Sequence, residues 1–161
     1  MAEHKEIERK FLITQLPPLA NAEFHLIEQA YLCTEPVVRI RKEDDHYYMT
    51  YKAMGFLERE EYNLPLTAES YAHLLAKADG NIIRKKRYLL PYLSYTIELD
   101  VFEGDLKGLL LAEVEFTDTD NAASFHPPEW FGRDVTYEEC YHNNHLSQMK
   151  SIPTDENDPS S

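Results

Sequence analysis

Charged and apolar positions alternate along several short segments of this chain of 161 residues. The residues between the charged ones are mostly apolar, as at Ile7, Ile40, Leu99 and Val114. Residues i and i+2 of a β-strand point to the same side of the sheet, so the pattern predicts strands with one charged and one apolar face. The charged sets are Glu6, Glu8 and Lys10; Arg39 and Arg41; Arg59 and Glu61; Lys85 and Arg87; Glu98 and Asp100; Glu113 and Glu115.

Eight segments carry strand signals. An ordinary eight-stranded barrel fills its interior with apolar side chains. Here the charged faces are typical of the lining of a water-filled cavity, so we expect a barrel whose apolar faces point outward. The expected strands are 6–13, 25–33, 37–42, 47–53, 57–66, 82–90, 94–102 and 109–117.

Three further segments predict helices. Segment 67–80 has Thr67 as an N-cap, apolar residues at helical spacing and Gly80 near its end, which predicts a helix that covers the barrel. A brief helix is expected over 121–125, before Pro127 and Pro128. Residues 137–150 are expected to form a C-terminal helix with Thr136 as its N-cap.

The charged faces together hold seven acidic and seven basic residues, the bases including Lys52. One such pair is more often a solvated strand face, but here the pairs recur along the chain. Carboxylates are suited to Mg²⁺ or Mn²⁺, and guanidinium groups match the geometry of phosphate. The pattern therefore predicts a cavity that binds a polyanion together with divalent cations.

Composition narrows the class of protein. The formal net charge of −13 and the pI near 4.9 argue against a nucleic-acid surface, which needs a basic face. There is no apolar stretch of membrane length, no secretory signal and no cysteine framework, so we expect a cytoplasmic protein without a membrane partner. The length predicts one domain over residues 1–150, and residues 151–161 have the composition of a disordered tail.

An ordered set of motifs carries a family resemblance. The segment Glu6-Ile-Glu-Arg-Lys10-Phe is similar to the ExExK signature of the CYTH superfamily, the triphosphate tunnel metalloenzymes. The other charged pairs follow in the order of that family, and the stretch from Trp130 to Asn143 resembles its short bacterial members. The resemblance implies an α+β fold, namely an eight-stranded antiparallel β-barrel that forms a tunnel, with covering helices and a C-terminal helix.

The resemblance also implies roles for individual residues. Glu61 is the candidate for orienting the attacking water, with Lys85 and Arg59 as further catalytic residues. Many family members place a lysine on the C-terminal helix, whereas this chain has His142, Asn143, Asn144 and His145 there. The implied metal ligands, for Mg²⁺ or Mn²⁺, are Glu6, Glu8, Asp100, Glu113 and Glu115, and the implied phosphate ligands are Lys10, Arg39, Arg41, Lys52, Arg59, Lys85 and Arg87.

The function expected from the resemblance is metal-dependent hydrolysis of inorganic triphosphate to pyrophosphate and phosphate. Three alternatives remain at this point: a class IV-type adenylate cyclase, a nucleoside or thiamine triphosphatase, and a polyphosphate-binding module without turnover. No adenine-reading motif is evident, and the carboxylates that a binding module would lose are all present. Since the apolar outer faces exceed what one helix could cover, we also expect a homodimer.

Overall fold

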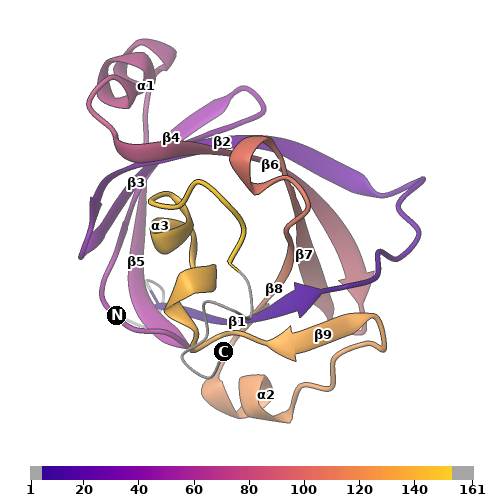
Figure 1. The fold of residues 1–161 in the computed structure, drawn as a ribbon. Helices are drawn as coiled ribbons and strands as arrows, with labels where there is room; N and C mark the ends of the chain where they lie inside the picture. Colours follow the sequence, from indigo (N-terminus) through magenta and orange to yellow (C-terminus); the bar gives the residue numbers. More distant parts are fainter. Residues whose placement is uncertain (1–4, 154–161) are drawn as a thin grey trace.

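A computed structural model describes residues 5–153 of the chain. Its sheet has the strand order β5-β4-β3-β2-β6-β7-β8-β1-β9, and every pairing is antiparallel. Strand β1 pairs with β8 and also with β5, so eight strands close into the expected barrel (Figure 1). The strands are β1 (Lys5–Ile13), β2 (Glu23–Thr34), β3 (Val37–Glu43), β4 (His46–Lys52), β5 (Glu58–Pro65), β6 (Asp79–Tyr92), β7 (Tyr95–Phe102), β8 (Leu110–Phe116) and β9 (Phe131–Asp134).

The alternation of charged and apolar residues has the predicted orientation. Arg39 and Arg41 of β3 face the interior cavity, while Ile40 between them is fully buried in a cluster with Tyr71 on the outer side. Leu99 and Val114, also fully buried, belong to a second outer cluster. The period of two in the sequence therefore identified both faces of the barrel wall.

The first helix, α1 (Ala68–Leu75), covers the outer side of β3 and β4, as expected. Thr67 is its N-cap: the Thr67 side chain accepts the amide hydrogen of Ser70, and the Ser70 hydroxyl accepts that of Thr67. The helix ends with Ala76 as its C-cap, and strand β6 already includes Gly80. The predicted helix is correct, but its predicted end near Gly80 lies too far along the chain.

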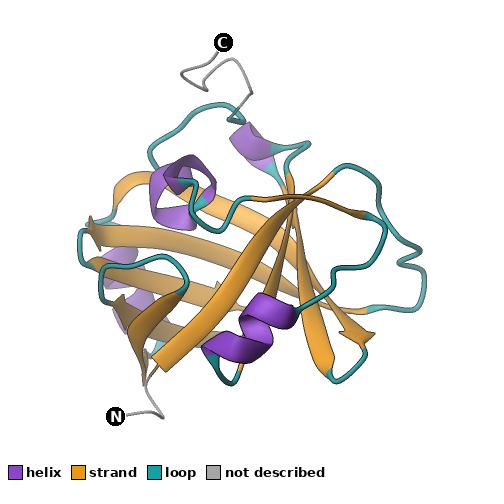
Figure 2. Cartoon of the chain, turned by 90° about the horizontal axis from the view of Figure 1, so that it is seen from below, coloured by secondary structure: helices purple, strands orange, loops and turns teal. Residues whose placement is uncertain are grey.

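The second outer cluster is covered by α2 (Thr119–Ser124) and the aromatic residues that follow it. The ring of Phe125 lies 6.1 Å from Phe11, 5.3 Å from Phe116 and 6.3 Å from Phe131. Figure 2 shows α2 lying against the outer side of the strands. Two separate segments of the chain therefore cover the apolar outer faces, and α2 corresponds to the brief helix expected over 121–125, although it begins two residues earlier and ends one residue earlier.

One end of the barrel interior is apolar and closed. Tyr31, Val37 and Phe102 belong to a cluster that also includes Val135 and Leu146 from the C-terminal segment. In Figure 1 this segment lies across the barrel opening, with α3 inside the outline of the strands. The charged cavity is therefore bounded at that end by a hydrophobic layer that the chain contributes itself.

The expectation of one continuous helix over residues 137–150 is wrong. The segment holds the 3-10 turn η3 (Glu139–Tyr141) and the single helical turn α3 (Asn143–Leu146), joined by an extended residue, His142. Thr136 caps no helix; its hydroxyl accepts the amide hydrogen of Lys10 in β1. The buried pairs 135–136, 141–142 and 146–147 repeat at intervals of five to six residues, which no single helix face can accommodate.

Strand β9 and the 3-10 turn η2 (Gly104–Leu106) were not expected from the sequence. Strand β9 is only four residues long and pairs with the end of β1, where Ile13 lies opposite Phe131. Gly80, at a φ of +77°, faces Ser147, and a Cβ atom there would lie 2.7 Å from the carbonyl oxygen of Ser147. Only glycine permits this close approach of β6 to the C-terminal segment.

Within residues 5–153, no helix has the length and apolar character needed to span a bilayer. The predicted tail begins at residue 151, and its residues 154–161 lie outside the described part of the chain.

Candidate active site

A cavity of about 300 Å³ occupies the interior of the barrel. Its lining includes six acidic and six basic side chains, all of them among the residues singled out by the sequence pattern. Lys85 and Asp100 are the two predicted residues that do not line it. The acids are Glu6, Glu8, Glu61, Glu98, Glu113 and Glu115, and the bases are Lys10, Arg39, Arg41, Lys52, Arg59 and Arg87.

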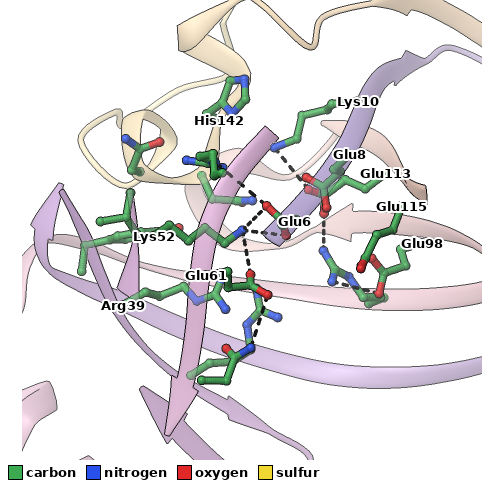
Figure 3. Close-up of a pocket in the computed structure, with 18 of the residues that line it drawn as sticks. Glu6, Glu8, Lys10, Arg39, Lys52, Glu61, Glu98, Glu113, Glu115 and His142 are labelled. Carbon is green, nitrogen blue, oxygen red and sulfur yellow. Dashed lines mark hydrogen bonds and ion pairs between the residues drawn. The ribbon is translucent and has the colours of Figure 1, made fainter. Parts of the chain in front are cut away.

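Four of these acids, Glu8, Glu98, Glu113 and Glu115, gather on one wall, which β1, β7 and β8 form. One carboxylate oxygen from each of Glu8, Glu98 and Glu113 lies within 4.8 Å of the others, and Figure 3 shows Glu115 beside them. Burial raises the pKa of Glu8 well above its usual value, and the neighbouring Glu113 raises it further. Burial likewise raises the pKa of Glu98. This concentration of buried negative charge is suited to a cation.

Glu113 differs from the other acids of this wall in that its pKa is lowered. Burial alone would raise its pKa, but Lys10 and Arg87 hold the pKa well below the usual value. The Lys10 ammonium lies 3.6 Å from a Glu113 carboxylate oxygen, and the Arg87 guanidinium donates to the other oxygen. Arg87 also lies 3.3 Å from Glu98, so it links two of the three clustered carboxylates.

A second charged group lies where β1, β4 and β5 meet. The Nζ atom of Lys52 lies 3.1 Å from both carboxylate oxygens of Glu6 and 3.4 Å from Glu61 (Figure 3). Asn63 also donates to Glu61, at 3.3 Å. Glu61 lines the cavity, and Lys52 and Asn63 hold its carboxylate in place.

The opposite wall is basic. Arg39 is buried and donates to Thr50 at 2.9 Å, and its Nε atom has no hydrogen-bond partner. Among the described residues, no carboxylate lies within ion-pair distance of it. Burial lowers the pKa of Arg39, and the neighbouring Arg41 lowers it further. Since a buried charge requires compensation, this wall is suited to an anion.

Lys85 and Asp100 form an ion pair beneath the lining. Lys85 Nζ lies 2.7 Å from Asp100 Oδ2, and both side chains are almost fully inaccessible. Asp100 also accepts two hydrogen bonds from Arg87, at 2.7 and 2.9 Å. Burial lowers the pKa of Lys85 to about 7, although Asp100 opposes the shift. The sequence pattern gave the correct face for both residues but not their depth.

The C-terminal segment adds His142, Asn143 and Asn144 to the lining. Burial lowers the pKa of His142 to about 3, and Lys10 contributes; its Nε2–H donates to the carbonyl oxygen of Thr136. Residues 142–145 were noted in the sequence, but no role in the site was assigned to them. The motif formed by Tyr141 and Asn143 was the sequence signal that could have indicated such a role.

The acidic wall fits a divalent cation by its donor chemistry. Glu8, Glu98 and Glu113 offer three clustered carboxylate oxygens, the hard ligands that Mg²⁺ and Mn²⁺ prefer. Glu115 lies next to them and is exposed. The two other predicted ligands are engaged elsewhere, Glu6 with Lys52 and Asp100 with Lys85 and Arg87.

The fold and the site together define a class of protein: a closed β-barrel whose charged interior is suited to a compact anion beside a cation. The model of the CYTH domain matches residues 4–138, most of the chain. The chain therefore belongs to the CYTH family. Membership implies a divalent metal ion, without specifying which one.

Relatives of known name support this assignment. An inorganic triphosphatase of Nitrosomonas europaea is 39% identical over 155 residues, which cover 92% of this chain and 99% of the relative. An inorganic triphosphatase of Acetivibrio thermocellus is 34% identical over 147 residues, covering 88% of this chain and 92% of the relative.

Solved structures agree with the fold. A crystal structure of an inorganic triphosphatase superimposes with a TM-score of 0.68 at 35% identity and covers 92% of this chain and 97% of the other. A putative adenylyl cyclase from Hippeastrum, described as having a dominant triphosphatase activity, superimposes with a TM-score of 0.56 at 15% identity. The alignment covers 73% of this chain and 82% of the Hippeastrum protein, and at that identity it supports the fold alone.

Proposed function

We propose that this protein hydrolyses inorganic triphosphate to pyrophosphate and phosphate. The observation that carries the proposal is the state of Arg39, a buried guanidinium with an unpartnered Nε atom and no carboxylate beside it among the described residues. It faces the same cavity as the carboxylate cluster. A phosphate chain would compensate the basic wall and a divalent cation the carboxylates, and relatives of nearly the same length are named inorganic triphosphatases.

The basic residues that line the cavity are proposed to hold the phosphate chain. Arg39, Arg41 and Arg59 provide planar guanidinium groups, and Lys10 and Lys52 provide point charges. Arg87 joins them from the acidic side. These groups stabilise the negative charge on the leaving pyrophosphate, and Lys85 adds positive charge from beneath the lining.

Glu61 is proposed to orient the attacking water. Lys52 and Asn63 hold its carboxylate at the cavity, so one oxygen can accept a proton from the water as the water attacks the terminal phosphorus. A bond forms between the water oxygen and the terminal phosphorus, and the bond from that phosphorus to the bridging oxygen breaks. The bridging oxygen leaves with pyrophosphate, and Arg59 is placed to stabilise the developing charge.

A divalent metal ion is proposed to bind at Glu8, Glu98 and Glu113, with Glu115 beside them and Glu6 nearby. Mg²⁺ or Mn²⁺ would neutralise phosphate charge and polarise phosphate oxygens there. Asp100 is proposed to support this site through Arg87, which it shares with Glu98 and Glu113.

The test is an assay of purified protein with inorganic triphosphate, ATP and thiamine triphosphate as separate substrates, each with Mg²⁺ or Mn²⁺. Phosphate release and cyclic AMP formation are measured in parallel. We expect inorganic triphosphate to be hydrolysed at least as efficiently as ATP, with no cyclic AMP, because the lining offers phosphate ligands and no base-reading group. Preferential formation of cyclic AMP would favour a cyclase, and binding without turnover would favour a binding module.

The homodimer and the cytoplasmic location remain predictions from the sequence, as does the single domain over residues 1–150. One outer face retains exposed apolar side chains: Phe24 and Leu26 of β2 are 46% and 53% exposed. They offer a surface for a second copy of the chain. Sedimentation at micromolar concentration as a monomer would contradict the dimer.

A further inference from the structure

The ammonium of Lys85 does not reach the cavity, but it contacts a residue that does. Lys85 Nζ donates to Asn143 Oδ1 at 3.4 Å, and Asn143 lines the cavity. We propose that Asn143 binds substrate, donating an amide hydrogen to a phosphate oxygen, and that Lys85 sets the orientation of this amide. The inference rests on the proposed function only in taking the ligand to be a phosphate chain.

The chemistry of the two groups determines which way the amide points. Lys85 donates to Asn143, and only the oxygen of an amide can accept a hydrogen bond, so the atom that faces Lys85 is the oxygen of Asn143. The amide nitrogen then points away from Lys85. It makes no hydrogen bond to another described residue, and it is not among the buried polar atoms that lack a partner. Its two hydrogens are therefore directed at open space on the cavity side.

The backbone around Asn143 is fixed on both sides. The Nε2–H group of His142 donates to Thr136 at 2.7 Å, and Asn144 Nδ2 donates to the carbonyl oxygen of Thr34 at 3.4 Å. The amide hydrogen of Ser147 donates to the carbonyl oxygen of Asn143. A side chain on a backbone held in this way loses little freedom when it binds a ligand.

Through this hydrogen bond the buried charge of Lys85 can act on the substrate, although Lys85 does not contact it. A hydrogen bond from a cation to the amide oxygen polarises the amide, which makes its N–H groups better donors. Lys85 therefore acts as a positioning residue, and Asn143 is the group in contact with phosphate. This also accounts for a lysine that lies on the cavity face of β6 but below the lining.

Titration calorimetry with inorganic triphosphate in excess EDTA tests the proposal without turnover. Asn143→Asp keeps an oxygen for Lys85 but removes both donor hydrogens and faces phosphate with a negative charge, so we expect binding to weaken ~10-fold or more. Asn143→Ala removes the donors without adding charge and should weaken binding about 5- to 10-fold. Asn21→Asp, at an exposed turn, makes the same change of charge and should bind like wild type.

A double-mutant cycle separates the positioning role from general loss of charge. In a Lys85→Met background the amide is free to turn, so Asn143→Ala should then cost about 2-fold or less. Thermal melting of each variant shows that it is folded. Affinity of both Asn143 variants within 2-fold of Asn21→Asp would overturn the proposal, and an equal cost of Asn143→Ala in both backgrounds would overturn the role of Lys85.

Failure of the proposed role of Asn143 can be distinguished from failure of the proposed function. Wild-type protein that binds triphosphate without hydrolysing it would overturn the hydrolase and leave the role of Asn143 to the binding comparison. Wild-type protein that fails to bind triphosphate, with or without Mg²⁺, would overturn both.

Discussion

The Nζ atom of Lys85 lies 2.7 Å from Oδ2 of Asp100, in a pair whose side chains are 0% and 1% exposed. Arg87 donates to both oxygens of the same carboxylate. Three charged residues from β6 and β7 thus form a compact buried group, although the sequence had placed one of them among the metal ligands and the other two among the phosphate ligands. Their mutual contacts determine how variants at these positions should behave.

Asp100→Asn should destabilise the fold more than it alters metal binding. Loss of the carboxylate leaves Lys85 buried without its counter-charge, at a cost of about 3 kcal/mol or more in the free energy of unfolding. Chemical denaturation measures this cost, and Asp105→Asn at an exposed position serves as the control. A variant with wild-type stability and weakened Mn²⁺ binding would return Asp100 to the set of metal ligands.

Glu98→Gln should weaken Mn²⁺ binding at least about tenfold. Removal of a group that only orients a metal ligand typically lowers metal affinity by about tenfold or more, and Glu98 is proposed to be a ligand itself. Calorimetry with Mn²⁺ measures the affinity directly, and Glu129→Gln on the surface controls for the change of charge. The activity of wild-type protein should also disappear in excess EDTA. Unchanged affinity in Glu98→Gln would move the metal site away from this cluster.

Arg39→Ala should lower kcat/KM for inorganic triphosphate tenfold or more. Each charge-assisted hydrogen bond to phosphate contributes on the order of 1.5 to 3 kcal/mol, and Arg39 has few competing partners in the protein. Arg84→Ala is the matched control, since Arg84 is exposed and paired with Glu28 on the outer side. Equal losses in the two variants would show that Arg39 has no particular contact with substrate.

His142 should make the fold less stable in acid. Its pKa is lowered to about 3 by burial and by Lys10, so between pH 6.5 and 3 the unfolded chain binds a proton that the folded chain does not. Stability falls as the pH falls through this window, by roughly 2 kcal/mol at pH 5 from this group.

The matched variant is His142→Gln, which retains a donor for Thr136 but does not titrate. Denaturation at pH 7 and at pH 5 should show a smaller difference for this variant than for wild type. The same difference in both proteins would mean that His142 is not the group responsible.

The short-range pattern of the sequence determined the faces of the barrel wall. A β-strand repeats every two residues, so Arg39 and Ile40 were assigned to opposite sides without any tertiary information. The N-cap at Thr67 was equally local, because a capping box needs only residues three apart. All eight barrel strands and α1 were therefore predicted, with differences only at their ends.

The depth of each side chain was decided by the tertiary structure. Lys85 and Arg87 have the same strand spacing, but only Arg87 lines the cavity, because Phe102 and the C-terminal segment cover the end of the barrel near Lys85. The depth of a side chain depends on the register between strands and on how that end of the barrel is closed. Neither can be read from a two-residue repeat in the sequence. The gathering of Glu98 with Glu8 and Glu113 depends on the same register.

The C-terminal segment shows the same division most clearly. Its local sequence favours a helix with Thr136 as the N-cap, but the Thr136 hydroxyl accepts from Lys10 and the Lys10 ammonium donates to the carbonyl oxygen of Tyr141. These contacts join residues more than 120 positions apart, and with the burial of Val135 and Leu146 they outweigh a helix preference of tenths of a kcal/mol per residue. The sequence by itself determined which residues could form the site, and long-range packing decided that Asn143 would be one of them.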